Sequence, residues 1–250
     1  MKLLIVTAVI AYIAAALSAR KEKTHIISTF VGLILHAGIT AYLLIGQAGW
    51  FFSLQNILLM LSLLVILTLF VSRIRIRLTY WIATAFAVFS LLWVLVLPYS
   101  PEYTPLMWES ITHILFSLTA YSVLSAASLL AIGLWVQTKR LRHISLNQKP
   151  ISQNSLLVNQ EKLYRMTAIG WLLLSMSLLT GILFVENYLG QQIGHKVVFS
   201  LFAWALFGIL LMGRFIRGWR GKTIIRLHLI AMILLATGFL GSKIVLEYIL

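Results

Sequence analysis

The sequence predicts an all-α, polytopic membrane protein with about eight transmembrane helices and both termini outside. Of its 250 residues, 61% are hydrophobic and 10% are charged, and the mean hydropathy of +0.97 lies far outside the range of soluble domains. Apolar stretches long enough to cross a bilayer recur along the whole chain, and basic residues gather in alternate loops. These observations together indicate a multi-pass membrane protein.

The predicted spans follow from the length of the apolar stretches, since a transmembrane helix needs roughly 17 to 25 such residues. In order along the chain they are 3–18, 26–45, 54–72, 78–97, 111–137, 164–188, 197–213 and 224–248. The first stretch also fits a signal peptide, but it leads directly into a basic loop instead of an exported domain. We therefore interpret it as the first transmembrane helix.

The short loops leave no room for a second soluble domain, so residues 1–250 are expected to form a single integral membrane domain. One polar insertion, 138–160, is rich in Asn, Gln, Ser and Lys and contains Pro150. It is predicted to be a cytoplasmic linker between five front helices, 1–137, and three back helices, 161–250.

The distribution of Lys and Arg predicts the orientation, because positive residues are retained on the cytoplasmic side. All 20 basic residues except Lys2, Lys196 and Lys243 lie in the first, third, fifth and seventh loops or at their edges. The net charge of +14 thus reflects which loops lie in the cytoplasm, and it gives no support to nucleic-acid binding. Anionic lipids of the inner leaflet are the expected partner of these residues.

The chain contains no cysteine. Disulfides, zinc thiolate sites and thiol redox catalysis are therefore excluded, and any thiol chemistry must come from a partner protein. We expect a binding or assembly protein and not an enzyme.

Four histidines lie inside or at the rim of the predicted spans: His36, His113, His195 and His228. An ionisable residue in hydrocarbon is by default a functional hypothesis. The rise of about 1.5 Å per residue places His113 and His195 near the outer surface, where they could share one ligand. His36 and His228 lie deeper and would share a second ligand only if their helices are offset or tilted.

Hydrogen bonding to a neighbouring helix explains His36 and His228 as well as ligand binding does. For His113 a ligand role is favoured, because polar side chains continue along the outer half of its helix: Ser117, Thr119, Tyr121, Ser122 and Ser125. His25 and His143 lie among cytoplasmic basic residues and are expected to face solvent or lipid headgroups.

Haem fits two outer histidines in an apolar cavity, since imidazoles supply its axial positions and arginines pair with its propionates. His113 and His195 are the predicted ligands of the iron, in a b-type haem. A bare metal ion would recruit carboxylates as well, and Glu109 and Glu186 leave that alternative open. Trp171 and Trp204 lie within spans and could line a cavity for a flat apolar ligand.

Three separated segments resemble cytochrome c assembly proteins, the CcsA/ResC-like group with its short HemX/YpjD-type members. The first is PLMWESITH, which ends at His113. The second is EKLYRMTAIGW, from Glu161 to Trp171, together with LTG at 179–181. The third comprises 204–214, RGWRG at 217–221, and 238–243. The resemblance covers roughly the C-terminal three fifths and keeps the segments in order. It implies that His113 is an outer haem ligand and that the protein lies in a bacterial inner membrane.

Two departures from that family are clear. Its longer members carry a tryptophan-rich outer loop after the sixth helix, whereas 187–195 contains no tryptophan. Met212 stands about where those proteins have a histidine, two residues before Arg214. The sequence therefore favours a short member that binds or handles haem over a cytochrome c synthase.

Two classes of function stay open at this point. The first is a haem-binding factor that assists cytochrome c assembly, with other assembly proteins or thiol-bearing proteins as partners. The alternative is a non-haem accessory membrane subunit that regulates a transporter or a tetrapyrrole-synthesis enzyme, since a fold does not determine a function.

Overall fold

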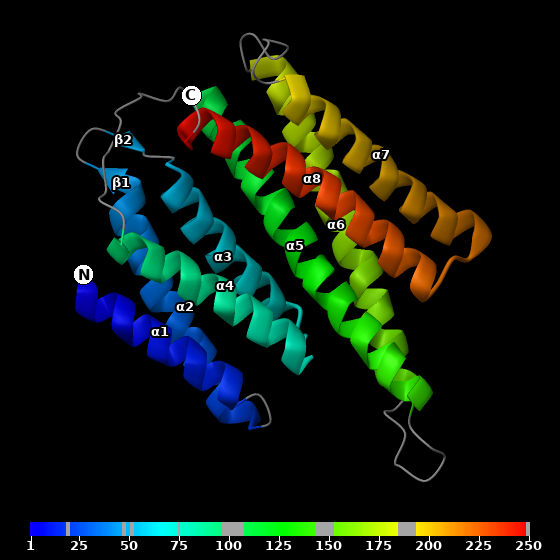
Figure 1. Ribbon diagram of the computed structural model, residues 1–250, viewed down its shortest axis with the longest axis horizontal. Helices are drawn as coiled ribbons and strands as arrows, with labels where there is room; N and C mark the ends of the chain where they lie inside the picture. The colour runs from blue at the N-terminus through cyan, green and yellow to red at the C-terminus, as the bar shows by residue number, and fades with distance from the viewer. Residues whose placement is uncertain are drawn as a thin grey trace. The chain divides into compact units, whose positions relative to one another are not determined.

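The structure, a computed structural model, describes the backbone of residues 1–18, 21–46, 49–50, 53–74, 76–96, 108–143, 153–184 and 194–248. Within these ranges the chain forms eight helices and one pair of two-residue strands (Figure 1). The predicted all-α fold is confirmed. Contacts divide the chain into two compact units, Met1–Ile111 and Thr112–Leu250, which we call unit 1 and unit 2.

Unit 1 is a four-helix bundle made of α1 (Lys2–Leu17), α2 (Glu22–Leu44), α3 (Leu54–Val71) and α4 (Arg77–Val96). Each helix packs on the next and α1 also packs on α4, which closes the bundle. At the end of α2, β1 (Ile45–Gly46) pairs with β2 (Gly49–Trp50) in antiparallel register. The side chain of Ser53 caps α3 by accepting a hydrogen bond from the Asn56 amide.

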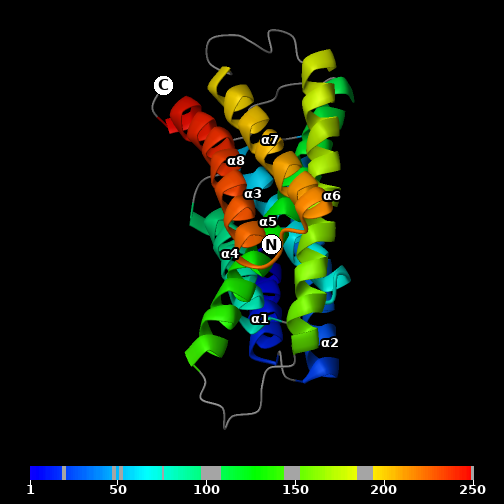
Figure 2. The same ribbon diagram turned by 90° about the vertical axis from the view of Figure 1, so that its right-hand side faces the viewer.

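Unit 2 contains α5 (Trp108–His143), α6 (Gln153–Phe184), α7 (Gly194–Arg217) and α8 (Lys222–Tyr248), of which α5 begins just before the unit boundary. Helices α7 and α8 pack along each other, and α6 packs on α7 (Figure 2). Helix α5 approaches α6 closely at Gly170, where a Cβ would lie 2.6 Å from the Leu124 side chain. A larger residue at this crossing would force the Leu124 side chain to shift.

The turn between α7 and α8 is built on two glycines in the left-handed region, Gly218 and Gly221, each with a φ of 63°. The Gly218 and Trp219 amides donate to the carbonyls of Arg214 and Gly213, which terminates α7. The indole of Trp219 then folds back over Gly213, in space that any Cβ would occupy. The turn is therefore held by packing as well as by hydrogen bonds.

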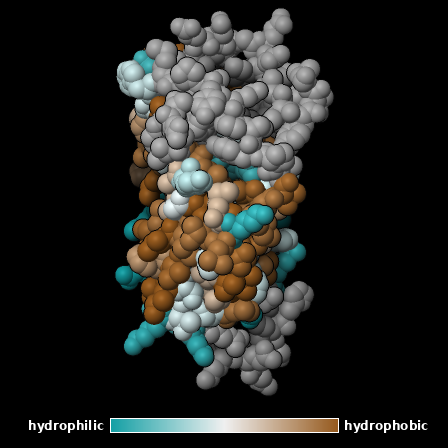
Figure 3. Space-filling view, turned by 90° about the vertical axis from the view of Figure 1, so that its left-hand side faces the viewer, coloured by the Kyte–Doolittle hydropathy of each residue, from teal (hydrophilic) through white to brown (hydrophobic). Residues whose placement is uncertain are grey.

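Seven of the described helices are long and apolar enough to cross a membrane, whereas α1 has only 16 residues. At about 1.5 Å per residue α1 extends about 24 Å, somewhat less than the hydrocarbon thickness of about 30 Å. Large hydrophobic side chains are exposed on all of these helices, and Figure 3 shows one face dominated by them. Such a surface is expected where helices face lipid.

Helical structure extends into both ends of the polar insertion at 138–160. Helix α5 continues to His143 and α6 already begins at Gln153, so most of the insertion is helical, while 144–152 lies outside the described residues. Polar residues are compatible with helices that project beyond the bilayer, and an ion pair between Glu161 and Arg165, one turn apart, supports the start of α6. The contacts group the helices as α1–α4 and α5–α8.

Candidate functional site

Three of the predicted site histidines have side chains that the structure describes. His36 lies on α2 in unit 1, whereas His113 on α5 and His228 on α8 lie in unit 2. The side chain of His195, at the start of α7, lies outside the described residues, as does that of His143. The predicted pairing of His113 with His195 therefore stays a prediction.

His113 is part-buried between α5 and α6. Its Nδ1–H donates to the Ser177 main-chain carbonyl oxygen at 2.9 Å, and the Thr180 hydroxyl lies 3.3 Å from the same nitrogen. Because a carbonyl can only accept, this bond assigns the proton of the neutral ring to Nδ1 and the lone pair to Nε2. Nε2 lies 3.5 Å from the Ser117 hydroxyl, at the limit of a hydrogen bond.

The hydroxyl groups beside His113 connect α5 to α6. Ser117 Oγ lies 2.7 Å from Ser177 Oγ and also donates to the main chain of its own helix. The polar side chains predicted along α5 therefore connect the two helices in part. The Thr119 hydroxyl donates to main-chain carbonyls of α5 itself, and the Tyr121 ring packs against Phe239. The sequence analysis missed Ser177 as a partner, and its only signal was a hydroxyl residue inside an apolar span.

His228 is fully buried, and both of its ring nitrogens are used. Nε2–H donates to Ser128 Oγ at 3.0 Å and to the Leu124 carbonyl at 3.3 Å, both on α5. Nδ1 accepts from the Thr167 hydroxyl of α6 at 3.0 Å, and the ring packs on Phe207 of α7. One imidazole on α8 therefore joins all the other helices of unit 2.

His36 is also fully buried, but only one of its ring nitrogens has a partner. Nδ1 lies 3.1 Å from the Tyr12 hydroxyl of α1, whereas Nε2 makes no hydrogen bond among the described residues. If Tyr12 donates to Nδ1, one polar group is left without a partner, namely Nε2–H. If Nδ1–H instead donates to Tyr12, both the Nε2 lone pair and the Tyr12 hydroxyl proton are left without a partner. Because unpaired polar groups are costly when buried, donation from Tyr12 to Nδ1 is favoured.

His25 corrects a prediction. We expected it to face solvent or headgroups, but it is buried in unit 1, where Nδ1–H donates to the Ala15 carbonyl at 2.9 Å and the ring meets Tyr80 edge-on. The reason is its position in the first turn of α2, which packs along α1.

Trp171 and Trp204 stack on each other across α6 and α7, with ring centroids 5.5 Å apart and an interplanar angle of 19°. The Trp171 indole N–H donates to the Trp204 carbonyl, and the Trp204 indole N–H donates to Ser175 Oγ. Both indoles are thus satisfied by contacts between the two helices. This arrangement accounts for them without a flat ligand.

The described residues contain no group of three or more His, Cys, Asp or Glu side chains that could hold a metal ion. Glu109, one turn before His113 on α5, has a buried carboxylate oxygen without a hydrogen-bond partner in the described part of the chain. The side chain of Glu186, the other carboxylate considered, lies outside the described residues.

Comparisons with known proteins agree with the segment resemblance. The chain matches the cytochrome C assembly protein family over residues 1–250. It is 31% identical over 238 residues to the inner membrane protein YpjD of Escherichia coli K12, covering 91% of this chain and 88% of that protein. The YpjD proteins of strains CFT073 and O157:H7 match to the same extent, and no solved structure matches. The predicted inner-membrane location agrees with these relatives.

Proposed function

Because this chain belongs to the cytochrome c assembly protein family, we propose that it binds haem b and assists cytochrome c assembly without being an enzyme. His113 supplies one imidazole to the iron. When bound, haem offers an iron with two axial positions that imidazoles can occupy. The chain has no cysteine, so the thiols of cytochrome c assembly must belong to partner proteins.

The observation that carries this proposal is the hydrogen bond from His113 Nδ1–H to the Ser177 carbonyl. Metal-ligating histidines characteristically donate their second ring nitrogen to a carbonyl or carboxylate, which orients the ring and raises its basicity. The same bond places the lone pair of His113 on Nε2, the atom that would meet the iron. The lone pair of His228 is not available in this way, because it lies on Nδ1, which is 3.0 Å from the Thr167 hydroxyl.

Haem suits this donor set better than a bare metal ion does. A bare ion needs several protein ligands in one place, and the described residues bring no three candidate ligands together. Haem needs only axial ligands, since the macrocycle provides the other four. His195, expected from the sequence at the same outer end of the membrane, is the second residue that we propose would hold haem.

Purified protein, expressed with ample haem supply, tests the proposal by its absorbance in the Soret region. We expect His113→Ala to lower haem occupancy by at least about tenfold. His143→Ala is the matched control and should leave occupancy unchanged. A wild-type protein without Soret absorbance that also fails to bind added haem would contradict the proposal.

One observation favours the alternative, a non-haem accessory subunit that regulates a transporter or a tetrapyrrole-synthesis enzyme. His228 shows that an intramembrane histidine of this chain can be fully occupied by helix packing. If no haem binds, the same role extends to His113, whose bonds also join two helices. Haem titration therefore separates the two functions directly.

A further inference from the structure

The turn between α7 and α8 presents an exposed basic surface. We call it the basic turn surface, and it consists of Arg217, Arg220, Lys222 and Arg226, all of which are exposed. Immediately before it, Phe215 and Ile216 are 86% and 67% exposed. Cationic and large apolar side chains thus lie next to each other where two membrane-length helices end.

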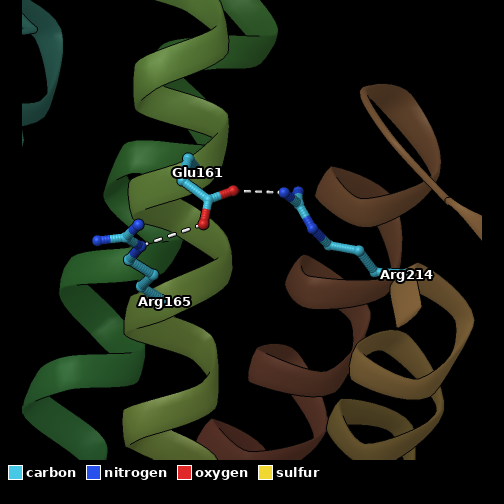
Figure 4. Close-up of polar contacts among 3 residues, drawn as sticks. All are labelled: Glu161, Arg165 and Arg214. Carbon is cyan, nitrogen blue, oxygen red and sulfur yellow. Dashed lines mark hydrogen bonds and ion pairs between the residues drawn. The ribbon is translucent and has the colours of Figure 1, made fainter.

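The positive charge of this surface is not neutralised within the described part of the chain. Arg214, one turn earlier, pairs with Glu161 of α6 (Figure 4). Its guanidinium also lies 4.4 Å from the centroid of the Tyr164 ring. Glu161 also forms an ion pair with Arg165. The four residues of the basic turn surface have no acidic partner there, and the sequence has no Asp or Glu between 187 and 246.

The surface is also held in a defined shape. The Trp219 indole packs over Gly213, and the two glycines with positive φ set the path of the chain between the helices. The pair between Arg214 and Glu161 attaches the end of α7 to α6. The basic side chains therefore project from a fixed turn and not from a free loop.

We propose that the basic turn surface binds the headgroups of anionic phospholipids. The four cations meet the phosphates, while Phe215 and Ile216 lie against the acyl region. An apolar flank and a position at the ends of two spans fit a lipid surface better than a nucleic acid, which offers no apolar region beside its phosphates. This goes beyond haem binding and does not depend on it.

Native mass spectrometry of the detergent-purified full chain, with equimolar phosphatidylglycerol and phosphatidylcholine, tests the proposal. We expect wild type to retain phosphatidylglycerol preferentially. Arg217→Gln/Arg220→Gln should lower that binding constant by at least about tenfold, whereas Arg217→Lys/Arg220→Lys should keep most of it. Gly213→Leu retains every charge but displaces Trp219, so it should reduce the preference by changing the shape of the turn.

Lys21→Gln/Lys23→Gln is the matched control, because it removes two exposed charges from the loop between α1 and α2. Its loss of preference should be much smaller than that of the arginine pair, because this loop adds only general attraction to anionic headgroups. Equal retention of the two lipids by wild type, or the same loss in the control pair as in the arginine pair, would overturn the proposal. The thermal stability of each variant in detergent, together with the lysine pair, separates loss of binding from loss of fold.

Discussion

His228 of unit 2 and His36 of unit 1 are both fully buried, but their ring nitrogens are used differently. His228 has partners at both nitrogens on two neighbouring helices. His36 has one partner, Tyr12, and an Nε2 without a hydrogen bond in the described part of the chain. Burial of an imidazole is therefore not by itself evidence of a ligand site, because the use of each nitrogen decides what the ring can do.

His228→Ala should give the largest effect, a loss of about 3 kcal/mol in the free energy of unfolding. It leaves a cavity beside Phe207 and removes the partner of Ser128 and Thr167. Unfolding in detergent micelles measures this loss, and His143→Ala is the control. A loss no larger than that of His36→Ala would contradict the distinction between the two rings.

Gly32→Leu should destabilise unit 1 by about 2 kcal/mol. A Cβ at Gly32 would lie 2.7 Å from the Tyr12 ring, so Tyr12 would move away from His36. Gly38→Leu on the same helix is the matched control, because its Cβ would meet nothing within 4 Å. Equal unfolding free energies for the two variants would show that the close approach of α1 and α2 is not needed.

Ser177→Ala should cost only about 0.6 kcal/mol, the average for a side-chain hydrogen bond between membrane helices. It removes the Ser117–Ser177 hydroxyl contact but keeps the carbonyl that orients His113. Haem occupancy of the purified variant should therefore equal that of wild type. A large fall in occupancy would mean that the hydroxyl, and not the carbonyl, positions His113.

His36→Leu should have the smallest effect, within about 0.5 kcal/mol of wild type. It removes one hydrogen bond together with a buried donor that has no partner, and these changes oppose each other. Unfolding in micelles measures the difference. A loss as large as that of His228→Ala would indicate that Nε2 of His36 has a partner in the membrane.

Helix positions followed closely from hydropathy, because a lipid environment forces each span to satisfy its own backbone hydrogen bonds. The predicted starts at 54 and 78 lie within one residue of α3 and α4. The prediction was less accurate where helices leave the bilayer. The polar residues among 153–160 interrupt the apolar pattern, although this stretch forms the first turns of helix α6.

Composition and the order of apolar and basic segments were enough to predict a multi-pass helical protein. Three short segments of sequence were enough to predict its family. The roles of the histidines depended on contacts between helices distant in sequence, such as His113 with Ser177 and His228 with Thr167. Apolar patterning records how deep a residue lies, but it carries no information on which hydroxyl or carbonyl lies opposite. That information exists only once the helices are packed, since a ring nitrogen is assigned as donor or acceptor by the atom that it meets.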